Sequence, residues 1–254
     1  MGSIFDWPLL IFVVVFGAQA GASYLGNGLR KKVRPLEADL REDFNTIQTA
    51  TLTLLGLIIG FSFSMAVSRY DQRKNCEEVE ANAIGTEFFR ADLLPAGNRE
   101  HLRDLLKQYA AQRVAFYEAG RLQSRIDEID AETAKLQSEL WSTVLPAARA
   151  QPTAVAALVV AGMNNVIDSQ GFTVAAWQNR IPVAAWGLMG LIAIACNLLL
   201  GFGSHRGEVR MLLILPVIVS IAFFLIADID SPRGGVIRVL PHNLIVLNQS
   251  IGAP

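Results

Sequence analysis

Residues 46–68 form an apolar run that is long enough to cross a membrane, and one side of this run is polar. With about 100° between successive residues of a helix, its small and hydroxyl-bearing residues fall within an arc of about 100°. These residues are Thr46, Thr49, Thr53, Gly60, Ser64 and Ser68. Leu57 lies inside the same arc, and Phe61 lies just beyond its edge. The pattern fits either a water-filled path with a constriction or a packing face, because small and hydroxyl residues also line contacts between membrane helices.

Three further runs have the length and apolar character of membrane spans, namely residues 8–26, 182–202 and 211–227. No series of short alternating segments suggests a barrel, so the spans are expected to be helices. Short connections join the first span to the second and the third to the fourth, which predicts two antiparallel hairpins. Pro216 lies inside the fourth run and is expected to kink its helix or mark its end.

The long region between the hairpins has the pattern of an all-α soluble domain. The helix of the second span meets no breaker before Pro95, and Asn98 is the expected N-cap of the next helix. Pro146 and Pro152 punctuate the chain before a last helix, expected over residues 153–179. The chain is therefore predicted to be all-α, with four transmembrane helices as two hairpins and an inserted helical domain. The predicted parts are a first hairpin over residues 1–68, the helical soluble domain over 69–180, a second hairpin over 181–230 and a C-terminal tail over 231–254.

Within the helical domain, one series of mostly apolar residues recurs at steps of four and three, which indicates a seam that packs against another helix. The seam consists of Leu122, Ile126, Ile129, Thr133, Leu136 and Leu140. In the tail, two short apolar segments, residues 236–240 and 244–247, are expected to dock on the helical domain or on a neighbouring subunit.

The composition is that of a membrane protein and gives no sign of catalytic chemistry. The chain is 52% hydrophobic and 18% charged, and its formal net charge of -1 offers no general attraction for nucleic acid. Motifs for acyl transfer, phosphate binding, zinc peptidase chemistry and paired-cysteine sites do not occur. Cys76 and Cys196 do not have the character of a disulfide pair. We expect no enzyme activity, no catalytic residue, no metal site and no cofactor.

Acidic residues at two places have a structural and a functional interpretation. Asp228 and Asp230 end the fourth span, where they either mark the membrane boundary or line a vestibule that attracts ions. The acidic run of Glu77, Glu78 and Glu80 lacks the spacing of a calcium loop and is expected to be solvated or salt-bridged.

Polar and small residues inside the spans predict contacts between helices. Gln19 and Asn197 are expected to form interhelical hydrogen bonds. Gly17 and Gly21 have the four-residue spacing that favours close helix contact.

The end of the second span resembles the bestrophin channels. There Gly60-Phe61 is followed by seven residues and then by Arg69-Tyr70, a pattern similar to the second helix of bestrophins. Longer segments resemble the bacterial bestrophin-like membrane proteins over most of the chain: GLIIGFSFSMAVSRYDQRKN, EEVEANAIGTEFFRADLLP and SPRGGVIRV.

The resemblance implies a homo-oligomer, a pentamer in bestrophins, with the second helix of each subunit around a central ion pathway. It implies a neck at Thr53, Leu57 and Phe61, of which Thr53 departs from the bulky apolar residues of bestrophins. The bestrophin calcium clasp has no equivalent beyond Asp228 and Asp230, so calcium activation is not expected. A multi-pass location in the bacterial inner membrane, with the helical domain in the cytoplasm, is also implied. The basic residues that flank the spans are almost equally divided between the two sides and do not decide this orientation.

Two functions follow from these observations. The first is an oligomeric ion channel in contact with membrane lipid and inorganic ions, with a pore lined by Thr46, Thr49, Thr53, Leu57, Gly60, Phe61, Ser64 and Ser68. The alternative is a membrane-anchored helical interaction or assembly protein, in which the seam over residues 122–140 recruits a partner and no ion crosses. A long inverted repeat, which would support a transporter, does not occur.

Overall fold

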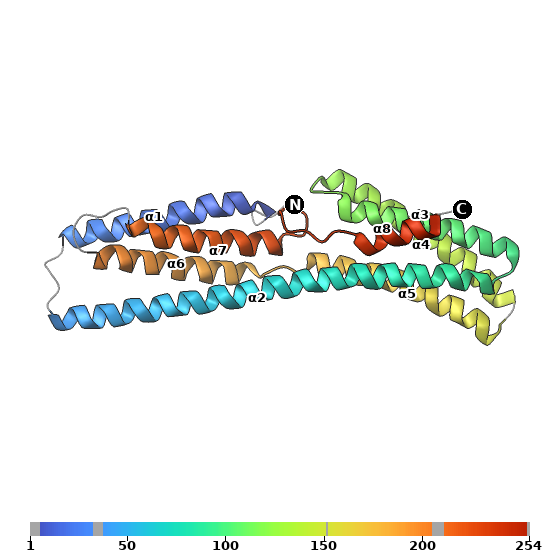
Figure 1. Ribbon diagram of the computed structural model, residues 1–254, viewed down its shortest axis with the longest axis horizontal. Helices are drawn as coiled ribbons and strands as arrows, with labels where there is room; N and C mark the ends of the chain where they lie inside the picture. The colour runs from blue at the N-terminus through green and yellow to red at the C-terminus, as the bar shows by residue number, and fades with distance from the viewer. Residues whose placement is uncertain (1–5, 33–37, 151, 205–210, 253–254) are drawn as a thin grey trace. The chain divides into compact units, whose positions relative to one another are not determined.

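The computed structural model describes residues 6–32, 38–150, 152–204 and 211–252, and these residues form helices and no strands. The predicted all-α class is therefore confirmed. Figure 1 shows the helices in chain order, and two short 3-10 turns, η2 and η3, accompany them. The helices are α1 (Pro8–Lys32), α2 (Ala38–Arg90), α3 (Ala96–Glu118), α4 (Gln123–Ala150), α5 (Ala154–Gln178), α6 (Val183–Gly203), α7 (Ile214–Asp230) and α8 (His242–Gly252), with η2 (Ala91–Leu93) and η3 (Met211–Leu213).

The chain divides into two compact units. The first unit comprises residues 1–69 and 180–237, and the second comprises residues 70–179 and 238–254. The first unit thus contains α1, the first part of α2, α6 and α7. The second contains the rest of α2 together with α3, α4, α5 and α8. The C-terminal segment therefore belongs to the second unit from residue 238 onwards.

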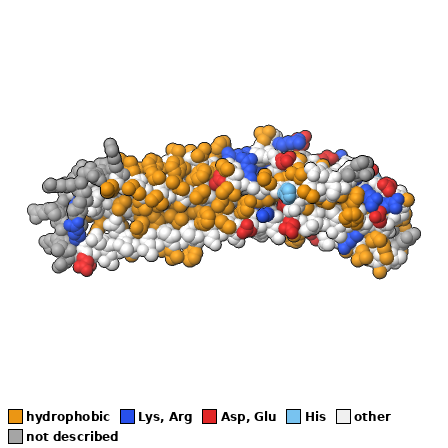
Figure 2. Space-filling view, in the orientation of Figure 1, with side chains coloured by type: hydrophobic (Ala, Val, Ile, Leu, Met, Phe, Trp, Pro, Cys, Tyr) orange, Lys and Arg blue, Asp and Glu red, His pale blue; other side chains and the backbone are white. Residues whose placement is uncertain are grey.

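Four stretches of the described chain are long and apolar enough to cross a membrane: Pro8–Arg30, Leu40–Leu93, Ala154–Gly203 and Met211–Asp230. Each contains one of the four predicted spans. The second stretch has 54 residues, which in a helix extend to about 80 Å, far beyond the roughly 30 Å of a hydrocarbon layer. Only its apolar part, residues 46–68, therefore has the length and character of a membrane span. Figure 2 shows mainly hydrophobic side chains over the visible face of the first unit.

Two glycines allow α1 and α6 to pack with their backbones in close approach. A Cβ atom added at Gly201 would lie 2.0 Å from the carbonyl oxygen of Ser23, and one at Gly26 would lie 2.2 Å from that of Leu198. No side chain fits in either place. By contrast, a Cβ at Gly17 or Gly21 would meet nothing within 4 Å. The prediction that these two glycines mediate close contact is therefore wrong within this chain, because Gly17 is exposed and Gly21 only partly buried, so neither faces a neighbouring helix closely.

The predicted polar contact between spans is present in the first unit. The Asn197 side-chain amide donates a hydrogen bond to Gln19 Oε1 at 2.8 Å, and the Ser23 hydroxyl donates to Asn197 Oδ1 at 3.2 Å. All three side chains are buried. Because lipid offers no alternative partner, such bonds fix the register of α1 against α6. At the end of α6, the ring of Phe202 packs against Phe44 of α2, with a centroid separation of 5.6 Å.

Three proline and cap predictions are corrected by the helix boundaries. Pro216 is the third residue of α7, where its missing N–H would have no helical partner, so it neither kinks nor ends the helix. Pro146 lies inside α4, which continues for one more turn to Ala150, so it is not a break. Asn98 is not an N-cap, because α3 begins at Ala96 and Pro95 takes the cap position.

The second unit has a continuous apolar core, and the predicted seam of α4 lies in it. Ile129, Thr133, Leu136 and Leu140 are buried, whereas Leu122 at the start of the seam is exposed. The prediction that the seam packs against another helix is confirmed by its contacts with α3 and α5. The seam is thus largely used within the chain, which removes most of the surface that the assembly-protein hypothesis needs.

From residue 238 onwards the tail docks on the second unit, as one of the two sequence-based alternatives predicts. Most of its first apolar segment does not dock, because Val236, Ile237 and Leu240 are exposed and only Val239 is buried there. Val239, Leu244 and Ile251 belong to the apolar core of this unit. Glu77 of α2 accepts hydrogen bonds from the Leu244 backbone N–H at 2.9 Å and from the Asn243 side chain at 2.7 Å. The carboxylate thus accepts a hydrogen bond from a free N–H group in the first turn of α8, and its negative charge is stabilised by the positive end of the helix dipole. The second apolar segment of the tail is therefore helical.

Candidate functional site

The eight residues predicted to line a pore are all exposed on α2 in the first unit. Leu57 and Phe61, the predicted constriction, are 53% and 64% exposed, although both are bulky and apolar. The packed side of the same span carries Leu55, Ser62 and Ala66, which are buried. The chain alone therefore covers one side of this span and leaves the predicted pore face uncovered.

A shallow groove of about 740 Å³ follows the first half of this face. It is lined by Glu42, Asn45, Thr46, Thr49, Ala50, Thr53, Leu54 and Leu57. Four of the predicted residues, Thr46, Thr49, Thr53 and Leu57, lie in it. Sequence reasoning missed Glu42 and Asn45 because they precede the apolar run. The helical period would have found Glu42, which lies four residues before Thr46.

Two of the hydroxyls in the groove donate their protons to the backbone of their own helix. The hydroxyl of Thr46 donates to the Glu42 carbonyl at 3.0 Å, and that of Thr53 donates to the Thr49 carbonyl at 2.9 Å. This bonding to the carbonyl four residues earlier is a common way for threonine to be accommodated in a membrane helix. A hydroxyl bonded in this way has oxygen lone pairs left for water or ions.

The polar part of the face is followed by the two bulky apolar residues, Leu57 and Phe61, one helical turn apart. Gly60 lies beside them, and a Cβ at this position would meet nothing within 4 Å. Ser64 and Ser68 continue the face beyond them and are exposed. The two bulky apolar side chains thus separate two hydrophilic stretches of the same face.

Asp230 is buried at the end of α7 and is engaged by several donors of the first unit. It accepts hydrogen bonds from the Arg180 guanidinium at 3.1 Å and the Ile181 N–H at 3.2 Å, and it lies 3.8 Å from Arg69. Arg180 also contacts Asp6, with 2.7 Å between nitrogen and oxygen. Arg180 therefore ties the segment before α1 to the end of α7.

Asp228 is also buried and organises the turn after α7. Its two carboxylate oxygens accept hydrogen bonds from the backbone N–H groups of Val236 and Ile237, each at 2.8 Å. A Cβ at Gly235 would lie 2.5 Å from the Asp228 carbonyl oxygen, so this turn needs glycine. These contacts explain both aspartates as parts of the fold, and their vestibule role stays a prediction.

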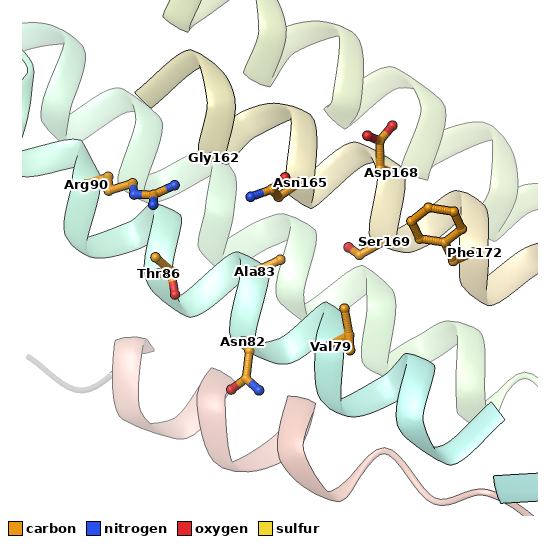
Figure 3. Close-up of a pocket in the computed structure, with 10 residues that line it drawn as sticks. All are labelled: Val79, Asn82, Ala83, Thr86, Arg90, Gly162, Asn165, Asp168, Ser169 and Phe172. Carbon is orange, nitrogen blue, oxygen red and sulfur yellow. The ribbon is translucent and has the colours of Figure 1, made fainter. Parts of the chain in front are cut away.

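In the second unit, a pocket of about 330 Å³ lies between α2 and α5. Figure 3 shows its lining residues, with Arg90 and Gly162 at one end and Val79 and Phe172 at the other. A Cβ at Gly162 would lie 1.9 Å from Oε2 of Glu87, so the missing side chain of this glycine leaves room for a buried carboxylate. Burial raises the pKa of Glu87 to about 7, although the nearby Arg90 guanidinium acts in the opposite direction.

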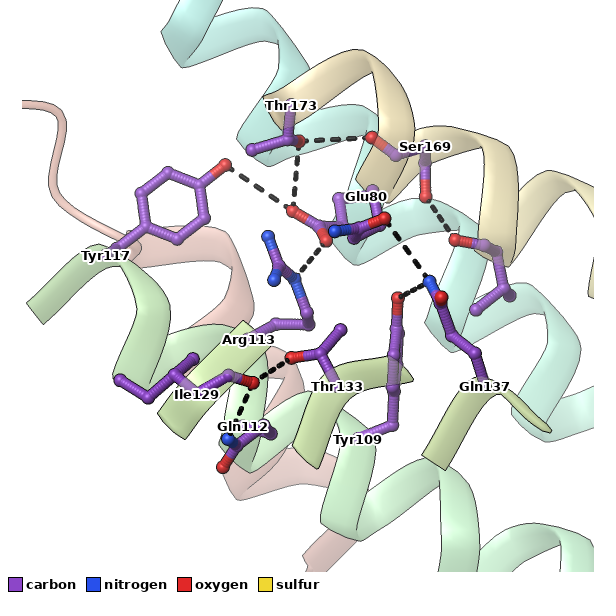
Figure 4. Close-up of polar contacts among 12 residues, drawn as sticks. Glu80, Tyr109, Gln112, Arg113, Tyr117, Ile129, Thr133, Gln137, Ser169 and Thr173 are labelled. Atoms are coloured by element: carbon purple, nitrogen blue, oxygen red, sulfur yellow. Dashed lines mark hydrogen bonds and ion pairs between the residues drawn. The ribbon is translucent and has the colours of Figure 1, made fainter. Parts of the chain in front are cut away.

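A second polar cluster of this unit joins α2, α3 and α5, as Figure 4 shows. Glu80 forms a buried ion pair with Arg113, and it accepts hydrogen bonds from the hydroxyls of Thr173 at 3.2 Å and Tyr117 at 3.4 Å. The Arg113 guanidinium also lies over the ring of Phe116, 4.4 Å from its centroid. The prediction that the acidic run is solvated or salt-bridged thus holds for Glu80, which is salt-bridged, and for the exposed Glu78. It is wrong for Glu77, which is buried and accepts hydrogen bonds from α8.

The described part of the chain contains no group of three or more His, Cys, Asp or Glu side chains arranged to hold a metal ion. The carboxylates of Asp230 and Glu80 are paired internally and link elements of the fold. The uncovered face of α2 is therefore the strongest candidate for a functional site.

Comparisons with known proteins agree with this architecture. A search of curated proteins gives no significant match. Among solved structures, a bestrophin homologue from Klebsiella pneumoniae with a tryptophan-to-alanine mutation matches with a TM-score of 0.67 at 13% identity, over 99% of this chain and 96% of that one. The same homologue with a tyrosine-to-alanine mutation matches with a TM-score of 0.65 at 15% identity, over 94% and 96% of the two chains. A third structure of the homologue, phased with zinc, matches with a TM-score of 0.62 at 15% identity, over 96% of this chain and 95% of that one.

At these identities the structural matches establish the fold. The model of the Bestrophin-like domain matches residues 20–244, and the chain therefore belongs to the Bestrophin-like family.

Proposed function

We propose that this membrane protein is an oligomeric ion channel and that α2 of each subunit lines its pore. The observation that carries the proposal is the uncovered face of α2, where all eight predicted pore residues are exposed. Water beside this face would interact with the free oxygen lone pairs of its hydroxyls, which lipid cannot do. A ring of subunits with α2 on the inside supplies water to the face and encloses the path.

Leu57 and Phe61 form the constriction in this proposal. Their side chains project from the uncovered face and do not pack in the core of the unit. In a symmetric ring each would be repeated once per subunit and would form an apolar collar. Thr53, one turn before Leu57, makes the entrance to this collar more polar than in the bestrophins that the sequence resembles.

The resemblance to bestrophins supports the finer assignments. We propose a pentamer in the inner membrane of a bacterium, with the second unit in the cytoplasm. The assembly-protein alternative has less support, because the seam of α4 is mostly buried against α3 and α5.

Reconstitution of the purified full-length protein in planar bilayers tests the proposal. Phe61→Ala and Leu57→Ala are expected to raise the single-channel conductance, because each widens the collar. Phe63→Ala is the matched control, since Phe63 is also exposed on α2 but is displaced by about 160° around the helix from Phe61. It should leave the conductance unchanged.

The oligomeric state is a second test. The mass of the protein in mild detergent should correspond to a ring of several copies. A stable monomer or dimer would contradict a central pore. Oligomeric protein that remains electrically silent over a range of voltage and pH would also refute the channel function.

A further inference from the structure

The groove on α2 has an acidic end. Glu42 is exposed and is the one residue with an ionisable side chain among the eight that line the groove. It lies one helical turn before Thr46, and its own backbone carbonyl accepts the hydrogen bond of the Thr46 hydroxyl. The carboxylate therefore lies on the same face as the hydroxyls, at one end of the predicted pathway.

Two of the three hydroxyls in the groove, those of Thr46 and Thr53, favour positively charged ions as well. An anion needs hydrogen-bond donors, and the protons of Thr46 and Thr53 are already donated to backbone carbonyls. The oxygen lone pairs that these hydroxyls leave free can coordinate a cation or orient its hydration water. The hydroxyl oxygens and the Glu42 carboxylate, which share one face of α2, thus both favour cations over anions.

The dipole of α2 opposes this preference for cations, but its effective charge is smaller than that of the Glu42 carboxylate. The N-terminus of α2 at Ala38 carries the equivalent of about half a positive charge, spread over its first turn. Glu42 contributes a full negative charge, and it lies beyond that turn. In a symmetric ring, the carboxylate is repeated in every subunit at the same height, which is how rings of acidic residues select cations.

We propose that the pathway selects cations and that Glu42 is the residue that sets this selectivity at its mouth. The inference rests on the proposed channel function and deepens it by naming the class of ion. Arg41, the neighbouring basic residue, lies well away from this face, because successive residues are about 100° apart around the helix.

The test is the ratio of potassium to chloride permeability, measured from the reversal potential across a planar bilayer with unequal KCl concentrations. The wild-type protein is expected to give a ratio well above one. Glu42→Gln should lower this ratio severalfold, and Glu42→Lys should bring it below one. Glu42→Asp, which keeps the negative charge, should retain most of the wild-type ratio. These variants are expected to fold, because Glu42 is exposed and accepts the Thr46 hydrogen bond through its backbone carbonyl, which the substitutions leave in place.

Arg41→Gln is the matched control. It changes the charge by one unit at the preceding residue of the same helix, yet Arg41 does not line the groove and lies about 100° around the helix from Glu42, on the side away from the hydroxyls. Its permeability ratio should stay close to that of the wild type. A change as large as that of Glu42→Gln would show that general surface charge sets the selectivity and would overturn the assignment to Glu42.

The outcomes separate this inference from the channel function. A conducting protein that prefers chloride, or whose permeability ratio is unaffected by Glu42→Gln, overturns the inference and leaves the channel intact. A protein that conducts no ion in any variant overturns both.

Discussion

Replacement of Glu87 by glutamine should make the second unit more stable at neutral and alkaline pH. The Glu87 side chain is 0% exposed, and neither of its carboxylate oxygens has a hydrogen-bond partner among the described residues. Its nearest cation is Arg90, with 3.9 Å between nitrogen and oxygen. The backbone of Gly162 leaves no room for water on that side. A charged carboxylate in this place loses its hydration and gains little in return.

The size of the effect follows from the pKa of Glu87, which burial raises from 4.5 to about 7. Below pH 4.5 the carboxyl group is protonated in both the folded and the unfolded chain. Between pH 4.5 and about 7 the unfolded chain loses the proton first, so stability falls as the pH rises. Above about pH 7 the loss is complete. At ~1.4 kcal/mol per pKa unit, the full loss is about 3 kcal/mol.

Thermal unfolding in mild detergent, followed by far-ultraviolet circular dichroism, measures this effect. Wild type and Glu87→Gln should differ little at about pH 4.5, and the variant should be more stable by up to about 3 kcal/mol at about pH 8. Glu78→Gln, an exposed position on the same helix, is the control and should show no such difference. A stability difference between wild type and Glu87→Gln that is the same at both pH values would refute the reasoning.

Two further substitutions test the packing of the first unit. Gly201→Ala should destabilise it by about 1–3 kcal/mol in detergent unfolding, because the new methyl group would collide with the Ser23 backbone. Gly187→Ala on the same helix meets nothing within 4 Å and should be neutral or slightly stabilising, so equal losses from both would contradict the close-approach argument. Asp230→Asn should cost roughly 1–3 kcal/mol, because it leaves Arg180 and Arg69 without a buried carboxylate. Limited proteolysis should then cut the N-terminal segment faster, and unchanged cleavage would show that Arg180 does not hold this segment through Asp230.

The spans and their helical character could be predicted because each depends only on a local run of apolar residues. A run of about 17–25 such residues determines its structure in lipid through backbone hydrogen bonding, whatever its neighbours are. That the eight small, hydroxyl and apolar residues share one face of α2 could be predicted for the same reason, since they recur with the helical period; their role as a pore lining stays a proposal. Glu42 shares this period but lies outside the apolar run, so a reading limited to the span missed it.

Contacts between distant residues could not be predicted from the sequence. The close approach at Gly26 and Gly201 depends on how α1 crosses α6, and the equally suggestive Gly17 and Gly21 are not used. The ion pair of Arg180 with Asp230 and the burial of Glu87 beneath Gly162 also depend on tertiary packing. Pro216 shows a related limit, because its effect depends on whether the helix begins at residue 214 or several residues earlier.

The most direct test of the central claim is the accessibility of single cysteines along α2 to a water-soluble thiol reagent. The two native cysteines, Cys76 and Cys196, would first be replaced by serine. Cysteines at Thr49, Thr53 and Ser64 should react, and their modification should reduce the current. Cysteines at Leu52 and Phe63, which are exposed on other sides of the same helix, should not react. Reactivity that follows the helical period is the predicted result, and protection of Thr49, Thr53 and Ser64 in a conducting protein would contradict a pore lined by α2.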